Sequence, residues 1–267
     1  MMKLMLLTAD PVFAAQAQDA GVDRIFLDLE YINKIERQMG RNTVISHNSV
    51  EDVAKLRRVL DRSDLLVRVN PINPNLKAEV DRVIADGADI VMLPMVIDAD
   101  DAQRFVEMVG GRAKVCLLLE TAQALVRMDS ILEVPGVEEI YIGLNDLHIS
   151  LGLRFMFETL SGGIVEYMAN KAKAKSIPFG FGGIAKIGEG MLPADYILGE
   201  HYRIGSTSAI LSRTFRNETG GVHNPLDLKT EIQKIRSRER EVASWTPEQF
   251  EENRLFVRDC VNKIVNG

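Results

Sequence analysis

Short apolar runs recur along the chain, and longer amphipathic stretches separate them. Six runs of four to six residues are bounded by turn or polar residues, which is typical of buried strands. These runs are Leu4–Leu7, Arg24–Leu29, Leu65–Val69, Ile90–Leu93, Val115–Leu119 and Glu139–Ile142. Weaker runs at Ile177–Phe181 and Tyr202–Ile204 predict a seventh and an eighth strand. Because the runs are continuous rather than alternating, both faces of the strands should be buried, as in a parallel sheet covered by helices.

The stretches between the runs have the spacing of helices. They are Pro11–Ala20, Ser49–Leu60, Leu76–Asp86, Ala99–Val109, Thr121–Leu132 and Ile164–Lys175. Eight strands that alternate with helices in 267 residues favour an α/β fold in which a (β/α)₈ TIM barrel closes, rather than an open sheet. We expect this barrel to occupy residues 1–215.

The character of the chain changes after residue 215. Residues 227–242 are highly charged and helical in pattern, and residues 245–250 (WTPEQF) begin another helix. In that start Thr246 can cap the helix and Pro247 takes the first helical position. One face of the helix carries an apolar stripe of Phe250, Val257, Val261 and Ile264. We expect residues 216–267 to form a C-terminal helical extension that packs on its own barrel or on a neighbouring subunit.

The amino-acid composition limits the kinds of binding partner that we expect. Lys plus Arg is 32 and Asp plus Glu is 38, a net charge of −6, which argues against nucleic acid or an anionic membrane as partner. Two cysteines are too few for a disulfide framework, and no apolar run approaches the length that crosses a bilayer. The opening MMKLMLLT indicates a first strand rather than a signal peptide. We expect a soluble, cytoplasmic protein whose partner is a small molecule.

Acidic residues follow two of the predicted strands. Glu120 ends the run Val115–Leu119, and Asp146 follows Glu139–Ile142 in the turn Gly143–Asp146. A strand, a helix and a second parallel strand place both strand ends at one edge of the sheet. The two carboxylates should therefore converge, and oxygen ligands of this kind suit a hard divalent cation such as Mg²⁺.

Other polar residues end the neighbouring strands, where barrel enzymes carry their active sites. They are Asp28 and Glu30, Arg68 and Asn70, the run FGFGGIAKIGEG after the seventh strand, and Gly205-Ser206 after the eighth. A divalent ion on Glu120 and Asp146 can chelate a 2-oxo acid and stabilise its enolate. Arg68 can donate to the same oxyanion, and the backbone N–H groups of Gly143–Asp146 can hold the carboxylate.

The motifs FLDLEY, LVRVN, DGADIVMLP, LLLET and GVEEIYIGLNDLHISLG resemble the HpcH/HpaI aldolase and citrate lyase β-subunit family over roughly residues 20–152. The resemblance implies a (β/α)₈ barrel that is often a homo-oligomer, a trimer or hexamer, with exchanged C-terminal helices. It also implies carbon–carbon lyase or condensation chemistry that depends on Mg²⁺ or Mn²⁺, forms no Schiff base, and passes through a pyruvate or acetyl enolate.

On this resemblance Glu120 and Asp146 match the metal ligands, and Arg68 matches the catalytic arginine. The turn formed by Gly143, Leu144 and Asn145, which ends at Asp146, matches the carboxylate-binding segment. Asp28 is also retained, to orient a partner or accept a proton.

One position departs from the family pattern. The hydroxy-oxo-acid aldolases carry a histidine directly after the acidic motif of the second strand, whereas this chain has Tyr31. A tyrosine with an ordinary pKa near 10 is a poor general base at neutral pH. His47 and His148 are alternative bases, each weighed against a surface or capping role. The citrate lyase-like branch also lacks the histidine, so Tyr31 leans towards that branch.

Two further segments have two readings each. Gly180–Gly190 can receive a phosphate or a substrate carboxylate, or it can be a tight turn that needs glycine. Ser206–Ser208 can serve a phosphate, although capping of the following helix is the favoured reading.

The sequence thus favours a metal-dependent aldolase or lyase that acts on a 4-hydroxy-2-oxo acid. The alternatives left open are a citrate lyase-like acyl-CoA lyase, a biosynthetic condensing enzyme, and a barrel that binds an oxo acid or a metal without catalysis.

Overall fold

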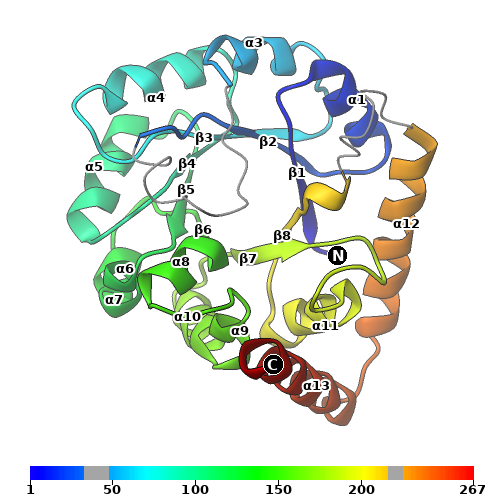
Figure 1. The fold of residues 1–267 in the computed structure, drawn as a ribbon. Helices are drawn as coiled ribbons and strands as arrows, with labels where there is room; N and C mark the ends of the chain where they lie inside the picture. Colours follow the sequence, from blue (N-terminus) through cyan, green and yellow to red (C-terminus); the bar gives the residue numbers. More distant parts are fainter. Residues whose placement is uncertain (33–47, 216–224) are drawn as a thin grey trace.

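The computed structural model describes residues 1–32, 48–215 and 225–267. Eight parallel strands close into a barrel in chain order, with β8 paired to β1 (Figure 1). The strands are β1 (Lys3–Leu7), β2 (Arg24–Asp28), β3 (Asp64–Arg68), β4 (Ile90–Leu93), β5 (Lys114–Leu119), β6 (Glu139–Ile142), β7 (Phe179–Ile184) and β8 (Ser208–Leu211). The predicted (β/α)₈ barrel is confirmed.

Helices surround the barrel on its outside (Figure 1). They are α1 (Pro11–Asp19), α3 (Glu51–Arg57), α4 (Leu76–Ala85), α5 (Ala99–Val109), α6 (Ala122–Val126), α7 (Met128–Leu132), α8 (Leu144–Ser150), α9 (Glu158–Ser161), α10 (Ile164–Ala174), α11 (Ala194–Ile204), the 3₁₀ turn η1 (Arg213–Phe215), α12 (Pro225–Val242) and α13 (Pro247–Asn266). Arg127 interrupts the predicted helix Thr121–Leu132, so that α6 and α7 are two short pieces.

Alternate residues of each strand face the interior of the barrel, and they stack in layers. The lowest layer holds a buried ion pair in which Arg24 Nη1 lies 2.7 Å from Glu139 Oε1. Above this pair lies an apolar cluster of Met5, Phe26, Leu66, Ile90, Met92, Cys116, Leu118 and Tyr141. The next inward position along β2 is Asp28, which pairs in register with Arg68 of β3. The same alternation that fills the barrel therefore delivers charged side chains to its upper end.

The eighth strand differs from the prediction. Tyr202–Ile204 is the last turn of α11, and β8 begins four residues later at Ser208. Gly205 ends the helix in the left-handed conformation, with φ of 85°, and its N–H bonds the carbonyls of His201 and Tyr202. The prediction of a strand at Tyr202–Ile204 is wrong because an apolar run of three residues is too short to distinguish the period of a helix from that of a strand.

The seventh strand also extends further than predicted. β7 runs to Ile184, so Gly180 to Gly183 lie within the strand rather than in the loop that follows it. The pairing of β7 with β8 has a register shift between Gly180 and Gly183. A Cβ on Gly180 would lie 2.4 Å from the Tyr141 ring and 2.3 Å from Ser208 Oγ. Glycine is required there because two strands and an aromatic ring meet at that point.

The C-terminal helices pack on the barrel of their own chain. α12 contacts α1 and α11, whereas α13 contacts α11 and α9. Val257 and Val261 of the predicted stripe are buried, and Thr246 and Gln249 form the predicted capping box. The predicted domain division at residue 215 borders the segment 216–224, which is outside the described residues.

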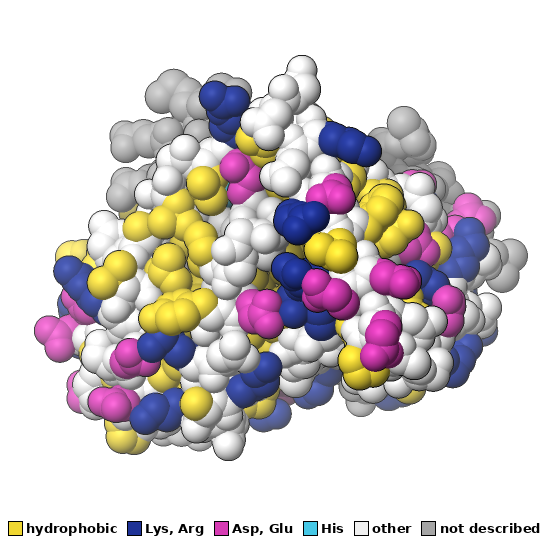
Figure 2. Space-filling model, turned by 90° about the horizontal axis from the view of Figure 1, so that it is seen from below, with side chains coloured by type: hydrophobic (Ala, Val, Ile, Leu, Met, Phe, Trp, Pro, Cys, Tyr) yellow, Lys and Arg dark blue, Asp and Glu magenta, His cyan; other side chains and the backbone are white. Residues whose placement is uncertain are grey.

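Figure 2 shows the face that α13 shares with α9 and α10, with acidic and basic side chains crowded on the α13 side. Pairs such as Arg254 with Glu251 account for part of this charge. No helix in the described part of the chain is long and apolar enough to cross a membrane.

Candidate active site

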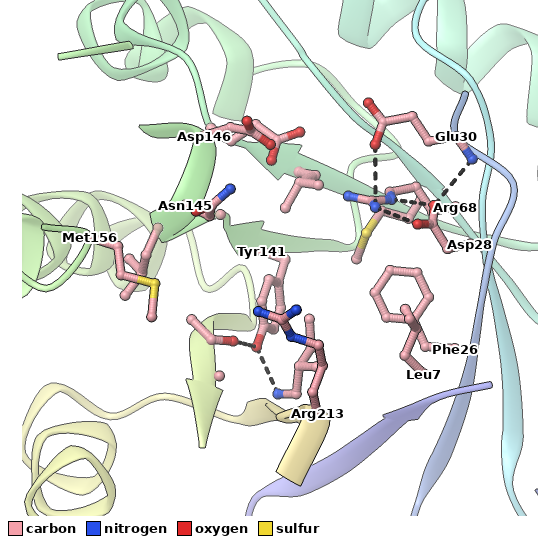
Figure 3. Close-up of a pocket in the computed structure, with 18 residues that line it drawn as sticks. Leu7, Phe26, Asp28, Glu30, Arg68, Tyr141, Asn145, Asp146, Met156 and Arg213 are labelled. Carbon is pink, nitrogen blue, oxygen red and sulfur yellow. Dashed lines mark hydrogen bonds and ion pairs between the residues drawn. The ribbon is translucent and has the colours of Figure 1, made fainter. Parts of the chain in front are cut away.

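A cavity of about 350 Å³ opens at the carboxyl ends of the strands (Figure 3). Its lining combines an acidic wall from β2, β5 and α8 with an apolar wall from β1, β7 and β8. The lining residues are Leu7, Phe26, Asp28, Glu30, Arg68, Met92, Leu118, Glu120, Tyr141, Gly143, Leu144, Asn145, Asp146, Met156, Gly182, Gly183, Ile210 and Arg213. All seven predicted site residues line this one cavity.

Arg68 is fixed by two carboxylates. Its Nε lies 2.9 Å from Asp28 Oδ1, and its Nη2 lies 2.8 Å from Asp28 Oδ2 and 3.3 Å from Glu30 Oε2. The guanidinium also lies over the Phe26 ring, 5.6 Å from its centroid. Burial lowers the pKa of Arg68, but the charges of Asp28, Glu30 and Glu120 outweigh it and raise the pKa overall. Arg68 is therefore a permanent, oriented cation.

The segment after β2 is held by Asn70 at the end of β3. Its Oδ1 accepts the N–H groups of Tyr31, at 3.0 Å, and Ile32, at 3.1 Å, and its Nδ2 donates to Glu79. These bonds place Glu30, which is 1% exposed, against Arg68. The Tyr31 side chain is 66% exposed and does not line the cavity. Asn70 thus turns Glu30 inwards and Tyr31 outwards.

Glu120 and Asp146 line the same wall of the cavity, as predicted, close enough for the charge of Asp146 to act on Glu120. Burial, with a further contribution from the Asp146 charge, raises the pKa of Glu120 well above its ordinary value. Glu120 Oε1 accepts the backbone N–H of Met95 at 3.2 Å. Met95 has φ of 55°, in the left-handed region, so strained backbone after β4 supplies this donor.

Gly143 makes room for Glu120. A Cβ at this position would lie 2.6 Å from Glu120 Oε2 and 2.9 Å from Glu120 Cβ. The φ of Gly143 is −84°, which any residue adopts, so the requirement for glycine is one of space. Leu144 and Asn145 follow in the first turn of α8 and complete this side of the cavity.

Neither alternative base is among the described residues that line the cavity. His148 lies on α8, is buried, and its Nδ1 lies 3.2 Å from the Leu144 carbonyl oxygen, away from the lining. His47 lies outside the described residues. Across the described ranges, then, no histidine and no tyrosine other than the buried Tyr141 lines the cavity.

Tyr141 lines the cavity although the sequence analysis did not single it out. Its hydroxyl donates to the Gly182 carbonyl at 2.7 Å and accepts the N–H of Ile210 at 2.9 Å. Burial raises the pKa of this phenol, which stays protonated. Tyr141 thereby holds the irregular part of β7 against β8. Met156 and Arg213 also line the cavity without having been singled out, and both follow elements whose ends the sequence did not define.

The remaining predicted segments lie elsewhere or have another role. Gly182 and Gly183 line the cavity as part of β7, whereas the rest of the run to Gly190 does not. Ser206 precedes β8, at the opposite end of the barrel from the cavity, and its Oγ lies 2.9 Å from His201 Nδ1. The predicted phosphate or cap role of Ser206–Ser208 after the eighth strand is therefore wrong.

The donor set suits a hard divalent cation, because two close carboxylates repel each other unless a cation lies between them. In the part of the chain that the structure describes, no group of three or more acidic, histidine or cysteine side chains is placed to bind a metal. A cation such as Mg²⁺ commonly binds one or two carboxylates together with substrate and water, so Glu120 and Asp146 fit it.

Comparison with solved structures supports the fold. The HpcH/HpaI aldolase from Desulfitobacterium hafniense DCB-2 aligns with a TM-score of 0.62 at 17% identity, over 92% of this chain and 95% of that one. An HpcH/HpaI aldolase/citrate lyase family protein from Burkholderia cenocepacia J2315 gives 0.63 at 17%, over 91% and 95%. Citrate synthase SbnG gives 0.62 at 17%, over 88% and 94%.

Sequence comparison identifies the family. No curated protein matches the sequence closely enough to count as a relative. The family model for HpcH/HpaI aldolase/citrate lyase, however, matches residues 2–161, which include β1 to β6 and the Asp28, Arg68, Glu120 and Asp146 side chains. This chain belongs to the HpcH/HpaI aldolase/citrate lyase family.

Proposed function

We propose that this protein is a divalent-metal-dependent carbon–carbon lyase that cleaves a 4-hydroxy-2-oxo acid through a pyruvate-type enolate. The observation that carries the proposal is that Glu120, Asp146 and the oriented Arg68 face one cavity at the carboxyl ends of the strands. Membership of a family of aldolases and lyases supports the same class of reaction.

Glu120 and Asp146 would hold the cation, Mg²⁺ or Mn²⁺. When bound, such an ion supplies Lewis-acid chemistry at the keto group of a 2-oxo acid. Burial and the Asp146 charge raise the pKa of Glu120. Two negative charges at this place are therefore unfavourable without a cation, and a bound cation would stabilise them. Gly143 keeps the space that this arrangement needs.

Arg68 would stabilise negative charge on the substrate. Its Nε and Nη2 groups bind Asp28 and Glu30, whereas Nη1 points into the cavity in Figure 3. Cleavage of the C3–C4 bond leaves an electron pair that moves onto the keto oxygen, and a preorganised cation there is worth several kcal/mol in a dry site. Both oxygens of Asp28 bind the guanidinium, so we assign Asp28 the role of orienting Arg68.

The turn at the start of α8 would receive the substrate carboxylate. Gly143, Leu144 and Asn145 line the cavity next to Asp146, so a carboxylate held there stands beside the cation site. This arrangement would present the 2-oxo group to Arg68 and leave the rest of the substrate towards the wall formed by β7, β8 and β1.

Tyr31 favours a second candidate. Its exposed ring lies where the aldolases of the family carry a histidine, so a citrate lyase-like acyl-CoA lyase or a biosynthetic condensing enzyme would use the same enolate without that residue. These reactions share the enolate with the first candidate. They differ from it in the group that is cleaved from the enolate carbon or condensed with it.

The deciding experiment is pyruvate release from a panel of 4-hydroxy-2-oxo acids, followed with lactate dehydrogenase, in Mg²⁺, Mn²⁺ or EDTA. We expect release that needs a metal and disappears in EDTA. Silence over the whole panel in both metals would contradict the aldolase proposal, and the assay would then be repeated with acyl-CoA substrates and in the condensation direction. A protein that binds Mn²⁺ and pyruvate but remains silent in these assays would be a binding barrel rather than an enzyme.

A further inference from the structure

The carboxylate of Glu79 lies outside the cavity but contacts the residue that holds its acidic wall. Glu79 stands in the first turn of α4, on the outside of the barrel (Figure 1), and is not part of the lining. Its Oε1 and Oε2 accept hydrogen bonds from the Asn70 side-chain Nδ2 at 3.0 and 3.1 Å. Oε1 also accepts the Asn70 backbone N–H at 3.2 Å. One carboxylate thus binds both the main chain and the side chain just after β3.

Asn70 is buried, so the polar atoms of its side chain need partners within the protein. Its Oδ1 accepts the N–H groups of Tyr31 and Ile32. Its Nδ2 donates to Glu79 and, at 3.3 Å, to the Leu29 carbonyl. Only one orientation of the amide satisfies all of these groups, because an ionised carboxylate and a carbonyl can only accept, whereas backbone N–H groups can only donate. The reversed amide would set its NH₂ group against two donors and its oxygen against two acceptors.

Glu79 is the group that makes this preference strong. A hydrogen bond to a charged acceptor is about twice as strong as one between neutral groups, so Glu79 binds the amide more tightly than the Leu29 carbonyl does. Burial raises the pKa of Glu79, although the hydrogen bonds that Asn70 donates oppose the shift. Leu76 and Val80, on either side of it along α4, are fully buried and fix the helix against the barrel. The carboxylate therefore presents a fixed, charged acceptor that decides which way the Asn70 amide faces.

The segment that Asn70 holds carries a residue of the site. Glu30 lies directly before Tyr31, and its Oε2 is 3.3 Å from Arg68 Nη2 (Figure 3). The Glu30 N–H donates at 3.1 Å to Asp28 Oδ1, the oxygen that also accepts Arg68 Nε. A shift of the backbone at Tyr31 would therefore disturb both carboxylates that orient the guanidinium.

We propose that Glu79 is a positioning residue of the active site: it fixes the orientation of the Asn70 amide and thereby keeps the carboxylates of the β2 segment on Arg68. Glu79 touches no substrate and acts only through Asn70. The inference rests on the proposed function, which assigns to Arg68 the stabilisation of an enolate. It adds a residue on α4, outside the cavity, on which the alignment of that guanidinium depends.

The first measurement needs no substrate. Amide hydrogen exchange at Tyr31 and Ile32 reports whether their N–H groups remain bonded to Asn70. Glu79→Met removes the acceptor but keeps a side chain of similar length, and we expect it to speed exchange at both positions by about fivefold or more. Asp81→Asn is the matched control, because Asp81 lies on the same helix but forms its ion pairs on the surface, and it should exchange as the wild type does.

The second measurement distinguishes positioning from a general loss of structure. Oxalate, a planar dianion that resembles the enolate of pyruvate, and pyruvate itself are titrated by calorimetry in Mn²⁺. A misplaced Arg68 should weaken binding of the enolate-like ligand more than binding of pyruvate. We therefore expect Glu79→Met to lower the affinity for oxalate by about tenfold or more, and the affinity for pyruvate by less. A merely structural role would lower both affinities alike.

A reversed pair keeps the test decisive if Glu79→Met does not fold. Asn70→Asp sets two carboxylates against each other and should weaken oxalate binding. Adding Glu79→Gln supplies an NH₂ group that donates to the new carboxylate, so the double variant should bind oxalate about fivefold or more tightly than Asn70→Asp alone. Absence of this recovery, unchanged exchange in Glu79→Met, or equal losses of oxalate and pyruvate affinity would overturn this inference alone. If the wild type binds neither ligand in Mn²⁺, the proposed function itself fails and this inference fails with it.

Discussion

Asp28 and Arg68 stand opposite each other at the ends of neighbouring strands, joined by two hydrogen bonds of 2.9 and 2.8 Å. The strand register alone brings their Cα atoms together, and the inward position of both follows from the alternation of each strand. Glu30 approaches the same guanidinium from the segment that Asn70 holds. The cation is thus oriented by its own scaffold before any substrate arrives.

Two substitutions of Arg68 distinguish the effect of its charge from the effect of its paired hydrogen-bond geometry. Arg68→Lys keeps the charge but cannot form two parallel bonds to Asp28, so we expect kcat to fall by about a hundredfold or more. Arg68→Met leaves Asp28 and Glu30 buried without their cation and should lower the free energy of unfolding by about 3–5 kcal/mol. Steady-state kinetics and urea unfolding check the two effects. Wild-type kcat in Arg68→Lys would rule out a role for the paired geometry.

Glu120 is expected to matter for activity rather than for stability. Glu120→Gln should reduce turnover by at least about a hundredfold, because a neutral amide is a weak ligand for a hard cation. Burial raises the pKa of Glu120 beside Asp146, so the amide also removes an unfavourable buried charge. In EDTA the variant should therefore unfold at a temperature no lower than the wild type.

Asp146→Asn provides the companion measurement. Its fold should also persist, as judged by circular dichroism, while Mn²⁺ binding and pyruvate release are lost. Retained, metal-dependent activity in either carboxylate variant would refute the assignment of the cation to this pair.

The acidic wall was predictable because its chemistry follows from topology. Glu120 and Asp146 each come directly after a continuous apolar run, and parallel strands joined by a helix must end at the same edge. No knowledge of side-chain conformations was needed to bring those two carboxylates together.

Arg213 shows where that reasoning fails. The run Tyr202–Ile204 is apolar and of the right length for a strand, but it forms the last turn of α11 before the left-handed Gly205. A strand at Tyr202–Ile204 predicts that Gly205-Ser206 follow it at the site, whereas the true β8 ends at Leu211 and is followed by Arg213. Because the eighth strand was predicted at the wrong position, the residues expected on that side of the cavity were wrong as well. The contact of the Met95 N–H with Glu120 could not be predicted from the sequence either, because it depends on a single positive φ angle.

Gly143 offers a steric test of the Glu120 position. In Gly143→Ala the new methyl group would lie 2.6 Å from Glu120 Oε2, so the carboxylate must move. Mutations that disturb metal ligands or the groups that support them commonly lower metal affinity by about 10- to 100-fold. We therefore expect the Mn²⁺ affinity of this variant to fall by about that factor. Gly183→Ala is the matched control: it lines the same cavity, but its Cβ would meet only the Ile210 carbonyl oxygen, at 3.5 Å. Equal effects of the two substitutions would argue against the steric explanation.

His201 should make the fold sensitive to acid. Its ring stacks on Phe181 at a centroid distance of 3.8 Å, and burial lowers its pKa to about 3. In the unfolded chain the imidazole takes up a proton below about pH 6.5, whereas the folded protein keeps it neutral down to about pH 3. Between these values the unfolded state binds more protons, so stability falls as the pH falls, by at most about 1.4 kcal/mol per pH unit from this group.

Substitution of His201 should therefore flatten the acid side of the stability profile. His201→Phe preserves an aromatic ring against Phe181, and Ser206 Oγ keeps its 3.1 Å contact with the Ser208 carbonyl. His201→Gln instead preserves a polar partner for Ser206, and neither replacement titrates. Urea unfolding at pH 7.0, 5.5 and 4.5 should show the wild type losing stability relative to both variants as the pH falls. Parallel profiles for all three proteins would mean that His201 accepts a proton in the folded state as readily as in the unfolded one.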